Sequence, residues 1–132
     1  MKSAMRLVMS LALLAITAAG AGAATIVVEQ VGTSWVPDGL SINVGDTVQW
    51  VWNSGVHTVT SGLNPGDPEA GDIFNANLTA GEPLFAFTFT EVGHYPFFCI
   101  PHYGLDMFGN IHVEDSVGEE AATWSAVKRL YD

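Results

Sequence analysis

Short runs of alternating or continuous apolar residues, separated by turn residues, make up the chain from Thr25 to Asp115. No stretch of this region keeps the 3.6-residue period of an amphipathic helix. The pattern therefore predicts strands, at Thr25–Val31, Leu40–Val44, Thr47–Asn53, His57–Ser61, Leu84–Thr90, Gly93–Cys99 and Gly109–Glu114. The pairs Gly45-Asp46 and Val92-Gly93 are typical of tight turns. Seven to eight short strands at this spacing predict an all-β fold, an antiparallel β-sandwich.

The segment from Gly62 to Gly81 interrupts this pattern. It contains Asn64-Pro65-Gly66-Asp67-Pro68, a run in which every residue favours turns over regular structure. We therefore expect a long excursion between two strands, with a short helical piece around Phe74–Leu78.

Both ends of the chain differ from this body. In the first 24 residues, Lys2 and Arg6 precede an apolar run and the small residues Ala21-Gly22-Ala23, which is typical of an export signal cleaved after Ala23 or Ala24. The run is short for a bilayer span, so an uncleaved anchor is the weaker reading and no transmembrane span is expected in the mature chain. Residues 116–132 place apolar side chains at near-helical spacing and predict a short C-terminal helix, either packed on the domain or used for attachment. The predicted divisions are thus a signal peptide at 1–24, one domain at 25–115 and a tail at 116–132.

The charge distribution excludes whole classes of partner. The chain has 14 acidic and 4 basic residues, and residues 25–115 contain no Lys or Arg. Nucleic-acid binding depends on such side chains to neutralise phosphates, so no nucleic-acid partner is expected. Without the first 24 residues the formal charge is −12. We expect a protein partner with a basic docking patch, since such a surface attracts positive charge over long range.

Candidate chemistry gathers in the nine residues from Cys99 to Met107. This segment offers a thiolate, the His102 imidazole and a thioether, a soft ligand set that favours copper over magnesium, calcium or manganese. Cys99 is the only cysteine, and Met107 is the only methionine after the signal region. A fourth ligand must come from elsewhere, and His57, at the start of a predicted strand, is the best candidate. Zinc competes for Cys and His ligands but is redox-silent.

At these residues the sequence resembles the cupredoxins, most closely the small blue-copper proteins of the plastocyanin and pseudoazurin type. The resemblance covers residues 25–115 and rests on Gly45-Asp46-Thr47-Val48-Gln49-Trp50, His57-Thr58-Val59, Gly93-His94-Tyr95-Pro96-Phe97-Phe98-Cys99, the Cys-x2-His-x4-Met spacing and Gly109-Asn110-Ile111-His112-Val113. It implies a Greek-key sandwich that holds one type 1 copper. His57, Cys99 and His102 would lie near a trigonal plane, with Met107 as a weak axial ligand.

The resemblance also implies a route for electrons, and the sequence differs from the family pattern at one position near the site. The ring edge of His102 would reach the surface inside an apolar patch, for which we expect Pro101, Tyr103, Leu105, Phe108 and Val56. Relatives often carry Gly before the axial Met, where this chain has Asp106, which places a carboxylate next to the expected axial ligand.

The remaining aromatic and histidine residues have simpler interpretations. His94 and His112 lie at a strand start and at an alternating position, and we expect them on the surface rather than as ligands. The many aromatic side chains are expected to fill the core.

These observations predict an exported, monomeric, non-catalytic protein, periplasmic or otherwise extracytoplasmic, that carries electrons on copper between cytochrome-like redox partners. The alternative is a copper-delivery or storage module that does not cycle between oxidation states. A copper oxidase or nitrite reductase would need further histidine-rich copper sites, and the four histidines include no His-x-His pair.

Overall fold

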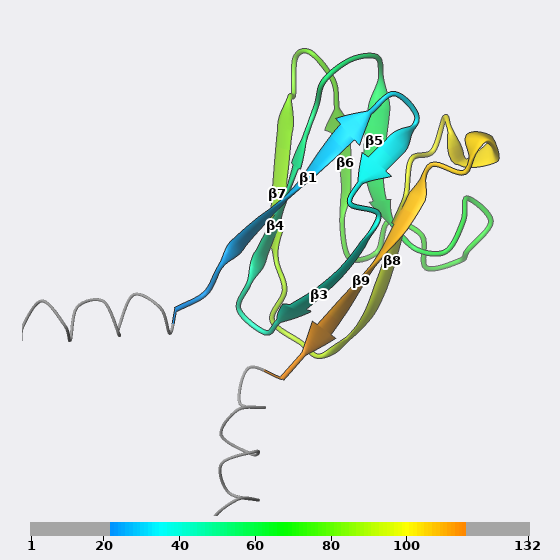
Figure 1. Cartoon of the computed structure of the whole chain (residues 1–132). Coiled ribbons are helices and arrows are strands. Elements are labelled where there is room, and N and C mark those ends of the chain that lie inside the picture. Colours follow the sequence, from blue (N-terminus) through cyan, green and yellow to red (C-terminus); the bar gives the residue numbers. More distant parts are fainter. Residues whose placement is uncertain (1–21, 116–132) are drawn as a thin grey trace, which may run out of the picture.

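Nine strands in two facing sheets form the part of the chain that the computed structural model describes, residues 22–115 (Figure 1). The strands are β1 (Thr25–Val31), β2 (Ser34–Val36), β3 (Gly39–Asn43), β4 (Thr47–Val51), β5 (His57–Ser61), β6 (Asn75–Leu78), β7 (Leu84–Thr88), β8 (Gly93–Phe98) and β9 (Phe108–Glu114). A single 3-10 turn, η1 (Tyr103–Leu105), lies between β8 and β9. The predicted signal peptide and C-terminal helix lie outside the described residues.

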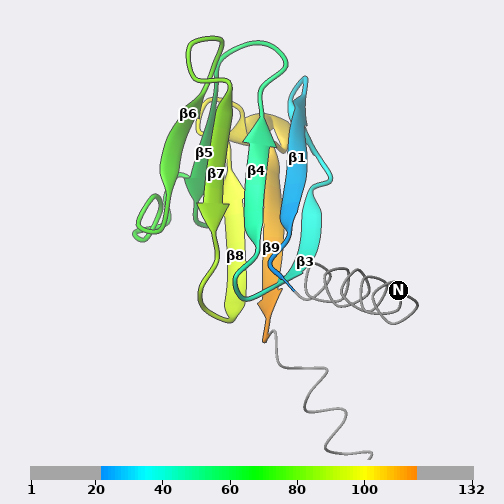
Figure 2. The same cartoon turned by 90° about the vertical axis from the view of Figure 1, so that its left-hand side faces the viewer.

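The two sheets are mixed, which corrects the expectation of an antiparallel sandwich with seven to eight strands. One sheet has the order β2-β1-β4-β7 and the other β3-β9-β8-β5-β6. In Figure 2, β7, β4 and β1 lie in front of β8 and β9. The pairs β1–β4 and β3–β9 are parallel. Between the two strands of each parallel pair, the chain passes through at least one strand of the other sheet. No hairpin signal in the sequence therefore marks these pairings.

All seven predicted strands are present, with ends that differ by no more than two residues, whereas β2 and β6 were missed. The helical piece expected around Phe74–Leu78 is wrong, because these residues lead into β6, which pairs antiparallel with β5. Phe74 and Leu78 are both buried, and Ala76 between them is half-buried, while Asn75 and Asn77 are exposed. Apolar residues four positions apart fit one face of a helix as well as one face of a strand. Here the burial alternates with a period of two residues, which is the period of a strand.

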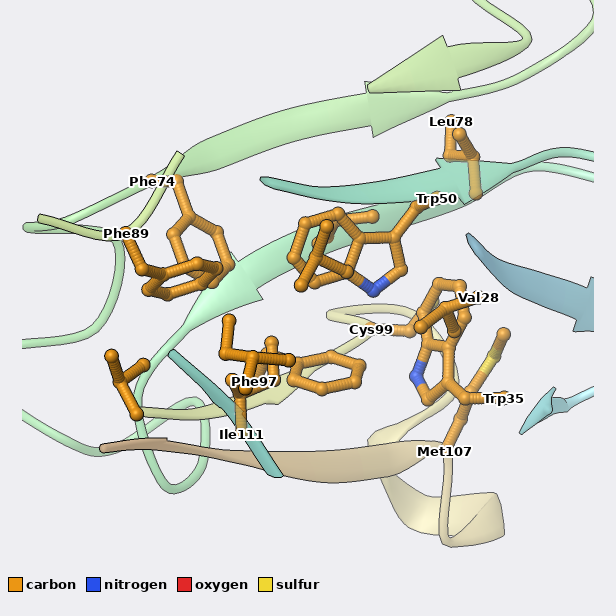
Figure 3. Packing of buried hydrophobic residues seen from close by; sticks show 14 residues of the cluster. Val28, Trp35, Trp50, Phe74, Leu78, Phe89, Phe97, Cys99, Met107 and Ile111 are labelled. Carbon is orange, nitrogen blue, oxygen red and sulfur yellow. The ribbon is translucent and has the colours of Figure 1, made fainter. Parts of the chain in front are cut away.

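The core lies between the sheets and is rich in aromatic rings, as expected (Figure 3). Trp50 on β4 is fully buried, and its ring centroid lies 5.3 Å from that of Phe97 on β8 and 5.5 Å from that of Phe74. Such edge-to-face and tilted contacts stabilise aromatic cores beyond the area that they bury. Cys99 and Met107 belong to the same buried cluster, so the candidate site continues the core at one end of the sandwich.

None of the helices among residues 22–115 is long and apolar enough to cross a membrane.

Candidate metal centre

Three of the predicted ligands converge from two separate segments. His57 is the first residue of β5, while Cys99 and His102 belong to the turn that connects β8 to β9 at one end of the sandwich (Figure 1). The Cys99 sulfur lies 3.7 Å from His57 Nδ1 and 3.4 Å from His102 Nδ1. The ligand atoms of all three residues lie within 4.8 Å of one another. The fold therefore places side chains 42 residues apart in sequence at one point.

The spacing and the donor types of this cluster fit one transition-metal ion. Metal–sulfur bonds of about 2.3 Å and metal–nitrogen bonds of about 2.0 Å place sulfur and nitrogen about 3.5–3.7 Å apart when both bind one ion at tetrahedral to trigonal angles. Of the two sulfur–nitrogen distances, 3.7 Å lies inside this range and 3.4 Å lies just below it. One thiolate with two imidazoles suits copper or zinc and excludes the hard cations that prefer oxygen.

The His57 ring is oriented for ligation through Nδ1. Its Nε2–H donates to the Ser54 carbonyl at 2.8 Å, which leaves the lone pair on Nδ1, the nitrogen nearer to the Cys99 sulfur. The pKa of His57 is lowered, chiefly by burial and further by the neighbouring His102, although the bond to Ser54 acts in the opposite direction. His57 is therefore held in its neutral form, which is the form that binds metals.

The turn that carries Ser54 is itself tightly held. The backbone N–H groups of Asn53 and Ser54 both donate to Gln30 Oε1, at 2.6 and 2.8 Å. Trp52 Nε1 donates to the Gly55 carbonyl at 2.8 Å. Gly55 has φ +80°, and a Cβ atom there would lie 3.1 Å from His57 Nε2, so the turn requires glycine at this position. No sequence motif indicated these supporting residues.

Cys99 is buried, and burial raises the pKa of its thiol. Hydrogen bonds from the backbone N–H groups of Thr58 and His102 to the sulfur partly offset this effect. The Ile100 N–H donates to Thr58 Oγ1 at 2.9 Å, which ties the start of the turn to β5. A cation bound at this sulfur must therefore displace its proton, and the N–H groups are already placed to stabilise the thiolate.

Backbone hydrogen bonds close the turn from Cys99 to Met107 on itself. The Cys99 N–H donates to the Met107 carbonyl at 3.0 Å, and the N–H groups of Leu105 and Met107 both donate to the His102 carbonyl. The side chain of Met107 is fully buried and lies at the same end of the core as Cys99 (Figure 3). The chain thus holds its thioether inside the protein, in the same buried core cluster as Cys99.

The Asp106 position has a conformational explanation. Its φ of +63° places it in the left-handed region, where Gly carries no penalty and Asp is among the better tolerated residues. Its N–H donates to the Tyr103 carbonyl at 2.9 Å, and its side chain is exposed. The departure from the Gly of relatives therefore preserves the turn and directs the carboxylate to solvent.

Apolar side chains surround the turn on the outside. Val56 is 67% exposed and Leu105 62%, and Pro101 and Phe108 are also exposed, whereas Tyr103 is half-buried. Tyr103 packs its ring against Phe108, with centroids 5.6 Å apart. Ile100, which sequence reasoning did not include, is 47% exposed. His102 is half-buried, so its imidazole lies between the Cys99 sulfur and this apolar surface.

The other two histidines lie away from this cluster. His94 on β8 and His112 on β9 are partners across the two strands, and both reach solvent, as expected from their positions in the sequence.

Comparison with known proteins agrees with the geometry of the site. Residues 23–114 match the family described as copper binding proteins, plastocyanin/azurin family. Plastocyanin of Prochlorothrix hollandica is 37% identical over 108 residues, which cover 76% of this chain and 82% of that protein. Plastocyanin of Chlamydomonas reinhardtii is 32% identical, with 80% and 77% covered. The solved structure of an oxidised mutant amicyanin is 28% identical, with a TM-score of 0.55, and covers 67% of this chain and 81% of that one. The chain therefore belongs to the plastocyanin/azurin family of copper binding proteins, whose members are electron carriers rather than enzymes.

Proposed function

We propose that the protein is exported and carries single electrons between redox partners, with copper held by His57, Cys99 and His102 and, more weakly, by Met107. Bound copper supplies a reversible one-electron change between Cu(II) and Cu(I). The observation that carries this proposal is the approach of the Cys99 sulfur to both Nδ1 nitrogens, at 3.4 and 3.7 Å, inside the protein.

The residues of the chain contribute a site that changes little between oxidation states. Two imidazoles, a thiolate and a thioether are a compromise between the preferences of Cu(I) and Cu(II). Because Ser54 fixes the His57 ring and the 99–107 turn is closed by its own hydrogen bonds, the donor atoms keep their positions. Small rearrangement favours rapid electron transfer.

The route to a partner runs through His102. Its imidazole is 3.4 Å from the Cys99 sulfur on one side and half-exposed on the other. The surrounding Val56, Pro101 and Leu105 offer an apolar surface on which a partner can dock without strong, long-lived charge pairs. Such a small contact suits the short-lived complexes of redox proteins.

Burial of the ligands favours electron transfer over copper delivery. Cys99 and Met107 are fully buried and His57 is 3% exposed, so a receiving protein cannot reach these ligands without opening the turn. A delivery or storage module needs ligands that an incoming protein can replace.

The proposals for export and for the partner rest on the N-terminal segment and on the charge of the domain. Residues 1–24 are proposed to direct the chain to the periplasm or another extracytoplasmic space and to be removed there, leaving the domain at 25–115 and the tail at 116–132. The domain carries acidic residues and no Lys or Arg, so copies of it repel one another and attract positive charge. This favours a monomeric protein that docks on a basic, cytochrome-like partner.

Voltammetry of the copper-loaded protein at an electrode separates the two functions. An electron carrier gives a reversible one-electron wave over many cycles, with copper retained afterwards. Irreversible waves, or loss of copper during cycling, would favour delivery and contradict the proposal.

A further inference from the structure

A second histidine pair lies on the outer face of the five-stranded sheet. His94 on β8 and His112 on β9 are directly opposite each other across the two antiparallel strands. His94 Nε2 lies 3.0 Å from His112 Nδ1, and the ring centroids are 4.4 Å apart. Neither residue belongs to the Cys99 cluster or to the apolar surface around His102.

The neighbouring carboxylate determines where the protons lie on this pair. Glu114 Oε1 is 3.7 Å from His112 Nε2 and favours a proton on that nitrogen. His112 Nδ1 then carries a lone pair, and the His94 Nε2–H donates to it. A cation that replaces this one proton gains two imidazole ligands at once.

The separation of the two nitrogens suits a shared metal ion. Metal–nitrogen bonds of about 2.0–2.1 Å place two ligand nitrogens about 2.9 Å apart at a right angle and about 3.4 Å apart at the tetrahedral angle. The 3.0 Å separation lies inside this range. Imidazole nitrogens favour Zn(II) and Cu(II) over Mg(II) and Ca(II).

We propose that His94 and His112 form a second metal site that binds one divalent ion of the zinc or copper(II) class through His94 Nε2 and His112 Nδ1. The Glu114 carboxylate, 3.7 Å from His112 Nε2, supports this arrangement through its charge, because it favours the proton on Nε2 and leaves Nδ1 for the metal. Water completes the coordination at this exposed position.

The electrostatic surroundings favour a cation. Asp67, Glu69 and Asp72 line the hollow that also includes His94. On the other side of β9, Ser41 pairs with His112 and carries no charge. The domain contains no Lys or Arg, so this negative potential is not compensated within it.

The site is independent of the proposed electron-transfer function. Cys99 is five positions beyond His94 in the sequence, which corresponds to about 16 Å along an extended chain. His112 is likewise five residues beyond Met107, so occupation of one site does not require the other.

The test is a Zn(II) titration of the reduced, copper(I)-loaded protein, followed by calorimetry and by NMR of the histidine side chains. We expect one equivalent of Zn(II) to bind and to shift the resonances of His94 Nε2 and His112 Nδ1, with those of His57 and His102 unchanged. His94→Gln and His112→Gln should each abolish this step. Glu114→Gln should weaken it by about 10-fold, as loss of a supporting carboxylate does.

A matched variant separates the histidine pair from the acidic hollow. Glu69→Gln combined with Asp72→Asn keeps both imidazoles and should still bind one equivalent. Zn(II) binding that survives the His94→Gln/His112→Gln double variant, or that requires Glu69 and Asp72 instead, would overturn the proposal. The histidine variants change no residue of the Cys99 cluster, so they should keep the copper colour after reoxidation. This colour serves as the control that the variants are folded.

Discussion

Gln30 fixes the position of Ser54, the residue whose carbonyl orients the His57 imidazole. Gln30 Oε1 accepts the Ser54 N–H at 2.8 Å, and the Ser54 carbonyl accepts His57 Nε2–H at 2.8 Å. Gln30 is fully buried, and its Nε2 donates to the Gly32 carbonyl, so both ends of the amide are used. A residue of β1 in one sheet thus controls a ligand on β5 in the other.

The substitution Gln30→Met should speed the loss of copper and lower the stability of the fold. The N–H groups of Asn53 and Ser54 lose their acceptor, which costs about 1–3 kcal/mol of the free energy of unfolding. Copper should be lost to a chelator faster than from the parent protein. The control is Val113→Ala, a core truncation near the opposite end of β9 from the turn, which should lower stability by about 2 kcal/mol and leave the copper-loss rate of the folded protein unchanged. Equal rates for both variants would show that Gln30 serves stability alone.

Two glycines with positive φ provide a matched pair of tests. Gly55→Ala adds a Cβ 3.1 Å from His57 Nε2, whereas a Cβ at Gly45 meets nothing within 4 Å. Both substitutions introduce backbone strain of about 1–2 kcal/mol, measured by urea unfolding. Only Gly55→Ala should shift the visible band and the reduction potential, because only it displaces the ring. A Gly45→Ala variant with the same spectral change would contradict this account.

The axial position is tested by Met107→Leu. If Met107 is a weak thioether ligand, its loss destabilises Cu(II) more than Cu(I), so the variant should keep copper and colour while its reduction potential rises. Voltammetry measures the change. Asp106→Gly is the control and should leave the potential almost unaltered, because the Asp106 carboxylate is exposed. A change with Asp106→Gly but none with Met107→Leu would identify the carboxylate as the axial donor.

Partner docking should depend on salt. A formal charge of −12 without the first 24 residues guides a basic partner toward the protein, and charges more than about 8 Å apart are largely screened at physiological ionic strength. The bimolecular electron-transfer rate with a basic cytochrome, followed by stopped-flow absorbance, should therefore fall steeply as salt is raised. A rate that is flat or rises would mean that the apolar surface around His102 governs docking.

Sequence reasoning could propose three of the four candidate ligands together because their spacing is local. Cys99, His102 and Met107 lie in one turn, and the soft donor set itself indicates the metal. His57 could be proposed because it opens a strand and few histidines compete with it. The alternation of apolar residues likewise predicted seven strands, since period two reports directly on burial.

The parts that were missed depend on tertiary contacts. β2 has three residues, too few to show a period, and β6 is an edge strand whose asparagines face solvent. The support of His57 by Gln30, and the pairing of His94 with His112, join residues 18 or more positions apart. Their side chains are unremarkable in sequence until the sheets bring them together.

The most direct test of the central claim is the visible spectrum of the copper-free protein after addition of one equivalent of Cu(II). Cys99 as a copper thiolate predicts an intense blue or green band that disappears on reduction, returns on oxidation and is absent from the Cys99→Ser variant. A colourless protein that holds a full equivalent of oxidised copper would contradict the account.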